Sequence, residues 1–308
     1  MTFPFKTQHK RSRLFLSFSG GKTSAYMTDR LLREYASHWD EVIVAFANTG
    51  QEHLKTLDYV EACDKQYGFN VVWLESVFSP IRGVGTKHRI VDHTTACRDG
   101  SIFKAMSEKH GIPNTQFPHC TRELKLYAIK SYLRSRGWKA NTYNTAIGIR
   151  ADEFDRMSLS AMRDGYIYPL IDLGITKDDV LAWELQQPVR LGIPEHHGNC
   201  VWCWKKSVRK LATVYREAPE AFQVARELEA DFKDHGPGFG DRRLFRGRRT
   251  VEDIAADAAS PDFVPYYDPH KWNADLDTGG GCSDSCEIGI DEATTTDPDE
   301  QTEPHEHD

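Results

Sequence analysis

A glycine-rich turn near residue 20 combines the residue types that bind an anion. Its residues, in order, are Ser17, Phe18, Ser19, Gly20, Gly21, Lys22, Thr23 and Ser24. Main-chain N–H groups in such a turn, between a strand and a helix, point toward an anion, and Lys22 adds positive potential. A Walker A loop needs a glycine where this sequence has Leu16, so the turn is of another kind. The sequence predicts either a phosphate site, with Lys22 as a candidate catalytic residue, or an ordinary strand-to-helix turn.

Three cysteines form the second group of candidate residues. Cys200 and Cys203 make a Cys-x-x-Cys pair in a predicted loop, and Cys120 directly precedes a predicted helix. The start of a helix and nearby basic residues favour the thiolate form of a cysteine. Because thiolates bind iron and zinc, all three are candidate metal ligands. Cys120 is also a candidate catalytic residue.

Four interpretations of these cysteines remain open. The first is one iron–sulfur cluster with an incomplete protein shell. The second is a structural zinc site whose fourth ligand is His197, His196 or Cys97. The third is a dithiol redox pair, and the fourth is a pair of buried, inert thiols.

The rest of the chain alternates between strand and helix patterns. Strands are predicted over residues 14–19, 41–48, 69–74, 141–150 and 166–171. Helices are predicted over residues 23–35, 52–67, 101–110, 121–136, 176–187, 205–215 and 218–232. This alternation indicates an α/β fold with a doubly wound, mainly parallel sheet. We expect a nucleotide-binding domain over residues 1–175, a mostly helical region over 176–265 and a flexible tail over 266–308.

Polar residues follow two further predicted strands. Asn48 and Thr49 close the second strand, whereas Gly148 and Arg150 lie at the end of the fourth, with Arg156 further on. Ligands of doubly wound sheets lie outside the carboxyl ends of the strands, so Asn48 and Thr49 are expected beside the glycine turn. Arginine forks can bind the oxyanions of a nucleotide. The alternatives are ordinary turn chemistry at Asn48 and ion pairs between the arginines and nearby acids.

The glycine turn resembles a known nucleotide-binding motif. The pattern Ser19-Gly20-Gly21-x-x-Ser24 is similar to the PP-loop, Ser-Gly-Gly-x-Asp-Ser, of the adenine nucleotide α-hydrolase superfamily. That superfamily includes N-type ATP pyrophosphatases, tRNA thiolases and phosphoadenosine-phosphosulfate (PAPS) reductases. Thr23 stands where the motif has Asp, which puts any role of that acid in question.

Two further motifs narrow the resemblance to the PAPS reductase family. The Asn-Thr-Gly of residues 48–50 is followed by Glu and then by Thr-Leu-Asp-Tyr-Val over residues 56–60. The Gly-x-Arg of residues 148–150 is followed by an acid and Arg156. In the family, this Gly-x-Arg lies where the phosphate or sulfate end of the nucleotide binds. The resemblance covers roughly residues 13–250.

The resemblance implies an adenine nucleotide, either ATP with Mg²⁺ or PAPS or adenosine phosphosulfate (APS). Iron–sulfur members of the superfamily use a lone Cys with a Cys-x-x-Cys, which implies a [4Fe-4S] cluster on Cys120, Cys200 and Cys203, with zinc as the alternative. The first hypothesis is ATP-dependent sulfur transfer, in which an acceptor is adenylylated, pyrophosphate leaves and sulfur displaces AMP. The implied partners are a nucleic acid (tRNA or DNA), a sulfur donor or thioredoxin-like reductant, and a second copy of the chain in a homodimer.

Two other functions compete with this hypothesis. PAPS reductases carry a nucleophilic cysteine in a C-terminal Glu-Cys-Gly-[Ile/Leu]-His segment, which this sequence lacks. Cys282 and Cys286, which follow three glycines, are a loose analogue. Reduction of PAPS or APS to sulfite is therefore the second hypothesis. The third is a non-catalytic nucleotide-binding protein with a structural metal site.

Charge and hydropathy restrict the surroundings of the protein. The chain has 308 residues and a formal charge of −7, with eight acids and no Lys or Arg in the last 18 residues, so this tail is predicted to be disordered. No run approaches the roughly 18 apolar residues of a membrane helix. The start of the chain lacks a signal core, so we expect a cytoplasmic protein without a membrane partner. Arginines concentrated over residues 242–249 indicate a solvated face or a nucleic-acid contact.

Overall fold

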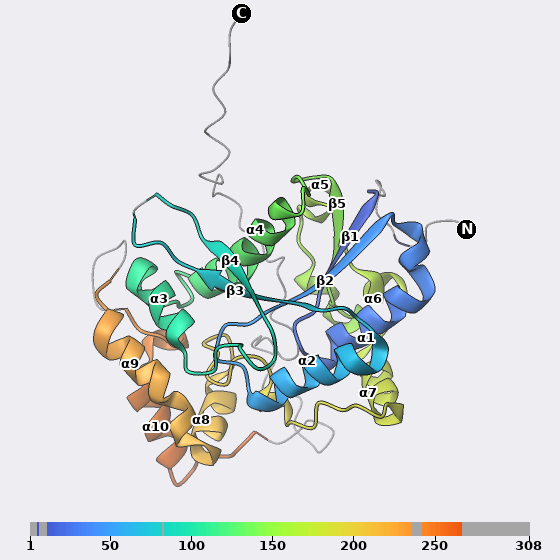
Figure 1. The fold of residues 1–308 in the computed structure, drawn as a ribbon. Helices are drawn as coiled ribbons and strands as arrows, with labels where there is room; N and C mark the ends of the chain where they lie inside the picture. Colours follow the sequence, from blue (N-terminus) through green and yellow to red (C-terminus); the bar gives the residue numbers. More distant parts are fainter. Residues whose placement is uncertain (1–4, 6–10, 82, 236–241, 267–308) are drawn as a thin grey trace, which may run out of the picture.

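The computed structural model describes residues 5, 11–81, 83–235 and 242–266 of the chain. A six-stranded sheet with the order β4-β3-β2-β1-β5-β6 crosses the molecule (Figure 1). Its strands are β1 (Arg13–Ser17), β2 (Glu41–Ala47), β3 (Val72–Val77), β4 (Lys87–Val91), β5 (Tyr143–Ala146) and β6 (Tyr166–Ile167). All neighbouring strands are parallel except β3 and β4, which are antiparallel.

Ten α-helices are described. They are α1 (Lys22–Arg30), α2 (Leu54–Tyr67), α3 (Ser101–His110), α4 (Tyr127–Ser135), α5 (Ala161–Asp164), α6 (Pro169–Asp172), α7 (Lys177–Gln186), α8 (Val208–Glu217), α9 (Gln223–Phe232) and α10 (Val251–Ala259). Shorter helical turns used below are η3 (Cys120–Leu126), η4 (Ala151–Arg156) and η5 (Glu195–His197).

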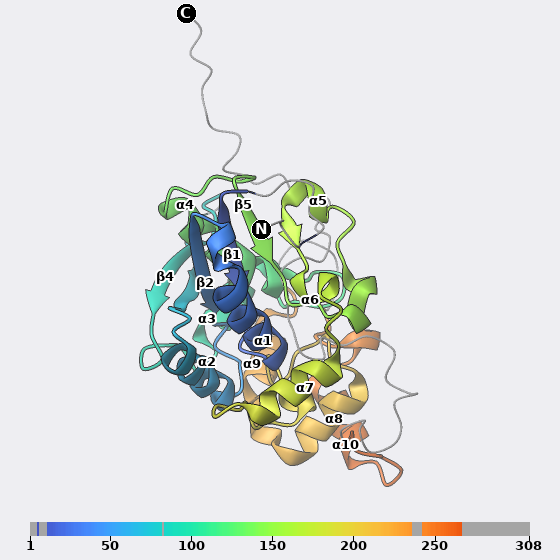
Figure 2. The same ribbon diagram turned by 90° about the vertical axis from the view of Figure 1, so that its right-hand side faces the viewer.

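Helices cover both faces of the sheet because side chains along each strand alternate between the faces. Leu14 and Leu16 of β1 belong to one buried cluster, which includes residues of α1 and α2. Phe15, between them, belongs to a second cluster with Ile129 and Leu133 of α4. Figure 2 shows the sheet between these two layers. The predicted doubly wound, mainly parallel α/β fold is confirmed.

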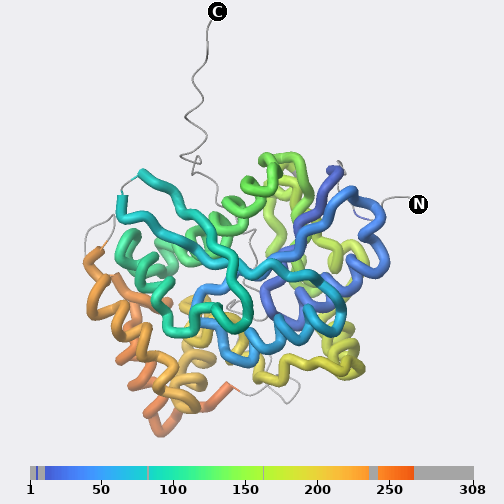
Figure 3. The backbone as a smooth tube through the Cα atoms, viewed as in Figure 1, coloured from blue at the N-terminus to red at the C-terminus, as the bar shows by residue number. Residues whose placement is uncertain are grey.

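The C-terminal helices build a separate hydrophobic core. Helices α8, α9 and α10 gather at one end of the molecule, next to α3 (Figures 1 and 3). Their buried residues, such as Leu211 and Ile254, form one cluster with Phe103 and Trp202. Helix α7 instead packs on α1, and its Val180 lies in the core of the sheet. The division of the chain at residue 175 stays a prediction.

Some element predictions need correction. Strand β4 was not predicted, because it is an edge strand with mostly exposed or half-buried residues and a basic composition. The strand predicted over residues 166–171 ends at Ile167, since Pro169 begins α6. Helix α10 was also not predicted, although Thr250 and Asp253 form a capping box at its start.

Two predictions fall outside the described residues. The acidic tail and the pair Cys282 and Cys286 lie within residues 267–308, which the structure does not describe. In the described part of the chain, every helix is too short or too polar to span a bilayer.

Candidate functional site

The three turns predicted to bind the nucleotide follow three adjacent strands. Strand β1 pairs with β2 on one side and with β5 on the other, and both pairings are parallel. The carboxyl ends of these strands therefore meet at one edge of the sheet. The glycine turn follows β1, Asn48 and Thr49 follow β2, and the segment with Gly148 and Arg150 follows β5. Because the strand order reverses direction at β1, this edge is the topological switch point, where doubly wound sheets bind ligands.

The glycine turn is held in one conformation by backbone and hydroxyl contacts. Gly20 has a φ of +79°, and a Cβ there would meet Cγ2 of Thr56 at 2.8 Å. The Ser24 hydroxyl accepts a hydrogen bond from the Ser19 N–H at 3.2 Å and donates one to the Gly21 carbonyl at 3.0 Å. No side chain of the described residues caps the start of α1, and its first turn contains no acid. The first amides of α1 therefore remain available for an anion.

Lys22 forms an ion pair in this structure. Its Nζ lies 2.9 Å from Oε2 of Glu184 on α7, and the carboxylate is almost fully buried. Glu184 also accepts a hydrogen bond from the Leu191 amide. The predicted contact between Lys22 and a phosphate therefore requires the ammonium to exchange partners.

Arg150 connects the β5 edge to the glycine turn. Its guanidinium is 3% exposed and donates to the Thr23 hydroxyl at 3.2 Å. The same group pairs with Asp152 at 3.1 Å and Glu153 at 3.5 Å. Burial raises the pKa of Asp152, but the hydrogen bonds and charge of Arg150 outweigh burial and lower this pKa. Thr23 is thus a neutral acceptor for Arg150, and the carboxylates that pair with Arg150 come from η4.

Arg156 also pairs with η4. Its Nη1 donates to Oε1 of Glu153 at 2.5 Å, so Glu153 serves both arginines. The ion pairs given above as an alternative are therefore present. Binding of an oxyanion by Arg150 and Arg156 stays a prediction.

Asn48 and Thr49 have different surroundings. The Asn48 amide is fully buried and donates to Oε1 of Glu75 at 2.6 Å and to the Cys97 carbonyl at 2.9 Å. Asn48 therefore fastens the ends of β2 and β3. The Thr49 amide and hydroxyl donate to the Glu52 carboxylate at 3.0 and 2.8 Å. The same hydroxyl lies 3.3 Å from Sγ of Cys200.

The structure brings Cys120, Cys200 and Cys203 together. All three line one pocket of about 360 Å³, a volume that includes space open to solvent. Thr49 lines the same pocket. The pocket therefore adjoins the strand edge that carries the glycine turn.

The two cysteine segments are positioned by contacts with distant residues. Val201 donates its amide to the Gln51 carbonyl at 2.9 Å, and the Trp202 indole donates to the Gln51 side chain at 2.5 Å. Cys120 is the first residue of η3, one residue before the predicted start of the helix. The Trp204 indole donates to its Sγ at 3.3 Å.

Aromatic and basic side chains surround the three thiols. Trp202 and Trp204 are buried, and Trp202 packs on Phe103 with ring centroids 4.8 Å apart. Lys125 is buried in the wall, and the Lys205 ammonium donates to a neighbouring threonine hydroxyl at 3.2 Å. The wall thus excludes water on one side and carries positive charge that can balance thiolates.

The spacing of the thiols bears on the choice of metal. Zinc–thiolate bonds of about 2.3 Å place the sulfur atoms of a tetrahedral site about 3.8 Å apart. Among the described residues, the group of three His, Cys, Asp or Glu ligand atoms within 4.8 Å of one another is His196, His197 and Glu217. The three cysteines do not form such a group, so at least one pair of their sulfur atoms lies more than 4.8 Å apart.

Sequence reasoning missed several contributors to this region. Gln51 and Lys125 carried no signal, because both residue types are common on surfaces. Glu75 did carry a signal in the sequence, since an acid within the apolar pattern of β3 indicates a buried partner. Its partners are Asn48 and Arg89, the latter at 2.6 Å.

The arginine cluster of residues 242–249 is partly taken up by internal contacts. Arg242 is 8% exposed, donates to the His110 carbonyl at 2.9 Å and lies 4.1 Å above the Phe117 ring. Arg249 pairs with Asp257. These two arginines stabilise the C-terminal core, and a nucleic-acid contact by the cluster stays a prediction.

The sheet, its switch point and the glycine turn define a doubly wound α/β protein. The profile of the phosphoadenosine phosphosulfate reductase domain matches residues 13–164. An uncharacterized nin region protein of Escherichia phage lambda is 32% identical over 278 residues, which cover 89% of this chain and 94% of the phage protein. The chain belongs to the PAPS reductase family.

A second relative matches only in part. An uncharacterized protein of Methanocaldococcus jannaschii is 28% identical over 183 residues. The match covers 57% of this chain and 36% of that protein. The chain therefore corresponds to about a third of this longer relative.

Proposed function

We propose that this member of the PAPS reductase family catalyses ATP-dependent sulfur transfer. In the proposed reaction, ATP binds with Mg²⁺ at the glycine turn and adenylylates an oxygen of an acceptor. Pyrophosphate leaves, and sulfide-level sulfur from a donor then displaces AMP, which departs with the acceptor oxygen. The acceptor class to test first is a nucleic acid, either tRNA or DNA.

The contact between Thr49 and Cys200 carries the proposal. Thr49 closes β2, whose neighbour β1 leads into the glycine turn, and its hydroxyl lies 3.3 Å from the Cys200 sulfur. We call the glycine turn (residues 17–24), Asn48, Thr49 and residues 148–156 the phosphate edge. Neighbouring strands are about 4.8 Å apart, so this edge and the cysteine pocket adjoin. This supports one reaction site that uses both nucleotide and thiol chemistry.

The residues at the phosphate edge would each make a different contact with the nucleotide. The glycine turn and the start of α1 would donate main-chain amides to the phosphates, aided by the positive end of the helix dipole. Lys22 would leave Glu184 to neutralise added charge. Arg150 would stay in place, because Thr23 and η4 hold it from two sides.

The residues of the cysteine pocket fit an iron–sulfur cluster. Three thiols from two segments line one pocket, and at least one pair of their sulfur atoms lies more than 4.8 Å apart. Trp202 and Trp204 would keep water away. When bound, a [4Fe-4S] cluster held by Cys120, Cys200 and Cys203 would supply an iron with an open position for sulfur.

Anaerobic purification with iron, sulfide and zinc quantified tests the cofactor. We expect about four iron and four sulfide per chain, lost in Cys120→Ala. Cys63→Ala is the matched control, because Cys63 is fully buried in α2, and burial raises its pKa to about 12. Zinc without iron or sulfide would remove the cluster from the proposal.

Product analysis tests the reaction. Release of pyrophosphate from ATP that depends on an added tRNA or DNA is the expected result. Release of sulfite from PAPS with a thioredoxin-like reductant would establish reduction instead. Tight binding of nucleotide with neither product would mark a non-catalytic protein.

A further inference from the structure

Two adjacent histidines and a glutamate converge next to the cysteine segment. His196 and His197 belong to η5, and Glu217 ends α8. The Nε2 atoms of the two histidines lie 2.9 and 2.7 Å from the same atom, Oε2 of Glu217. The histidine side chains are 5% and 12% exposed, whereas Glu217 is 41% exposed.

The three side chains also have the arrangement of metal ligands. One carboxylate oxygen has two acceptor positions, so two imidazole donors can share it without a metal. The same two nitrogens and one oxygen lie within 4.8 Å of one another, close enough to bind a single ion. In a tetrahedral zinc site with bonds of about 2.0–2.1 Å, neighbouring ligand atoms are about 3.3 Å apart. Small side-chain shifts would therefore make room for an ion.

The local backbone places the two rings on the same side. Pro194 precedes η5, and the tight turn of residues 195–197 keeps both imidazoles directed at the end of α8. The Lys206 ammonium donates to the His196 carbonyl at 2.7 Å and to the Val201 carbonyl at 2.8 Å. Lys206 thereby ties the histidine turn to the segment that carries Cys200 and Cys203. The positive charge of Lys206 would repel a divalent metal ion bound nearby and so limit the affinity of the histidines and Glu217 for that ion.

We propose that His196, His197 and Glu217 bind one divalent transition-metal ion of the zinc class, and that this ion fixes the cysteine segment to α8. Two imidazole nitrogens and one carboxylate oxygen suit zinc and similar borderline ions better than Mg²⁺ or Ca²⁺. The exposed side of Glu217 leaves a coordination position for water, so the ion exchanges with solvent. The site is separate from the cysteine pocket and does not depend on the sulfur-transfer proposal.

Binding of Zn²⁺ alone to the purified full chain, after treatment with a chelator, tests this site by calorimetry. We expect one site per chain, with affinity reduced at least about tenfold in His197→Ala and in Glu217→Gln. Glu217→Gln keeps the shape of an exposed side chain, so its fold is expected to be intact. Glu220→Gln, an exposed carboxylate three residues further on, is the matched control and should bind like the wild type.

Co²⁺ as a spectroscopic probe separates this site from the cysteines. Cobalt at the histidine site should show ligand-field bands without thiolate charge transfer, and Cys200→Ser should leave these bands unchanged. Equal Zn²⁺ affinity in the wild type, His197→Ala and Glu217→Gln would overturn the proposal. So would cobalt bands that disappear in Cys200→Ser but persist in Glu217→Gln, because the ion would then bind the cysteines.

Discussion

The phosphate edge and the cysteine pocket are built in opposite ways. At the phosphate edge, the candidate residues lie in the segments that follow β1, β2 and β5, and the strand order brings these segments together. In the cysteine pocket, Cys120 and Trp204 touch although they are 84 residues apart. The first region depends on the sheet, whereas the second depends on how the C-terminal helices dock against it.

The two regions also differ in charge. The cations of the phosphate edge already have carboxylate partners, as Lys22 with Glu184 and Arg150 with Asp152 show. The pocket instead combines thiols, indole rings and lysines. Nucleotide binding must therefore exchange ion pairs, whereas in the pocket the Cys200 thiol donates to Oε1 of Glu52 over a longer distance of 3.9 Å. Three substitutions test this contrast.

Gly20→Ala should have the largest effect on the free energy of unfolding. Its effect on binding should be limited to ATP at the phosphate edge. An added Cβ would clash with Thr56, and the φ of +79° is strained for alanine. Together these effects should cost about 4 kcal/mol of unfolding free energy. In the fraction of Gly20→Ala that remains folded, calorimetry should detect no binding of ATP. Metal content should not change.

Gly68→Ala provides the matched control. Gly68 ends α2 with a φ of +66°, and nothing lies within 4 Å of an added Cβ. Its cost should be only about 1 kcal/mol, with ATP affinity unchanged. Similar losses of ATP affinity in both variants would show that the close approach at Gly20 is not what shapes the phosphate site.

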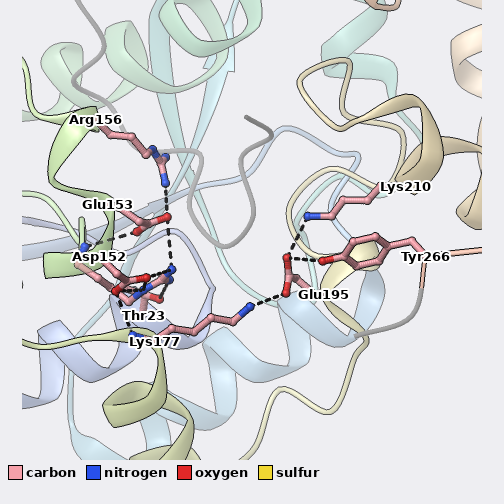
Figure 4. Close-up of polar contacts among 9 residues, drawn as sticks. Thr23, Asp152, Glu153, Arg156, Lys177, Glu195, Lys210 and Tyr266 are labelled. Carbon is pink, nitrogen blue, oxygen red and sulfur yellow. Dashed lines mark hydrogen bonds and ion pairs between the residues drawn. The ribbon is translucent and has the colours of Figure 1, made fainter. Parts of the chain in front are cut away.

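Glu195→Gln should weaken the link between the two regions. Glu195 pairs with Lys177 at 2.7 Å and with Lys210 at 2.9 Å, and Tyr266 donates to it at 3.1 Å (Figure 4). Burial raises the pKa of Glu195, but Lys210 and Lys177 outweigh burial and hold the pKa at about 2. Relative to an unfolded pKa near 4.5, this contributes about 3 kcal/mol to stability at neutral pH.

The pH dependence of unfolding checks this value. Because the folded pKa is depressed, the contribution is complete above pH 4.5 and disappears as the pH falls toward 2. Chemical unfolding of the wild type and Glu195→Gln should therefore differ most at neutral pH and converge in acid. A difference that stays constant from pH 7 to pH 3 would contradict the assignment.

Lys22→Gln should have the smallest effect on stability. Gln keeps a hydrogen-bond donor for the buried carboxylate of Glu184, and the Lys22 side chain is 25% exposed, so loss of the charge should cost about 1 kcal/mol. If Lys22 moves to the phosphates, the affinity for ATP should fall more than the affinity for AMP. Equal losses for both nucleotides would place the ammonium away from the terminal phosphates.

The fold was largely predictable where local pattern and burial agree. Strands β1 and β2 are apolar runs bounded by turns, and α3 spans the predicted residues 101–110. The prediction failed for β4, whose polar sequence pairs only because β3 offers a free edge. Of the site, the glycine turn and the cysteines were recognisable as residue types. Their partners Glu52, Glu75 and Glu184 were not assigned.

The sequence by itself determined the chemistry available to this protein: a turn that exposes amides, arginines after a strand, and three thiols. It also determined the family, because the motifs lie in fixed order along the chain. Only the tertiary structure decided that Arg150 reaches Thr23 across 127 residues, and that Cys200 meets Thr49. The physical reason is that motifs depend on neighbours in sequence, whereas the pairing of charges and thiols depends on strand order and on docking of distant helices.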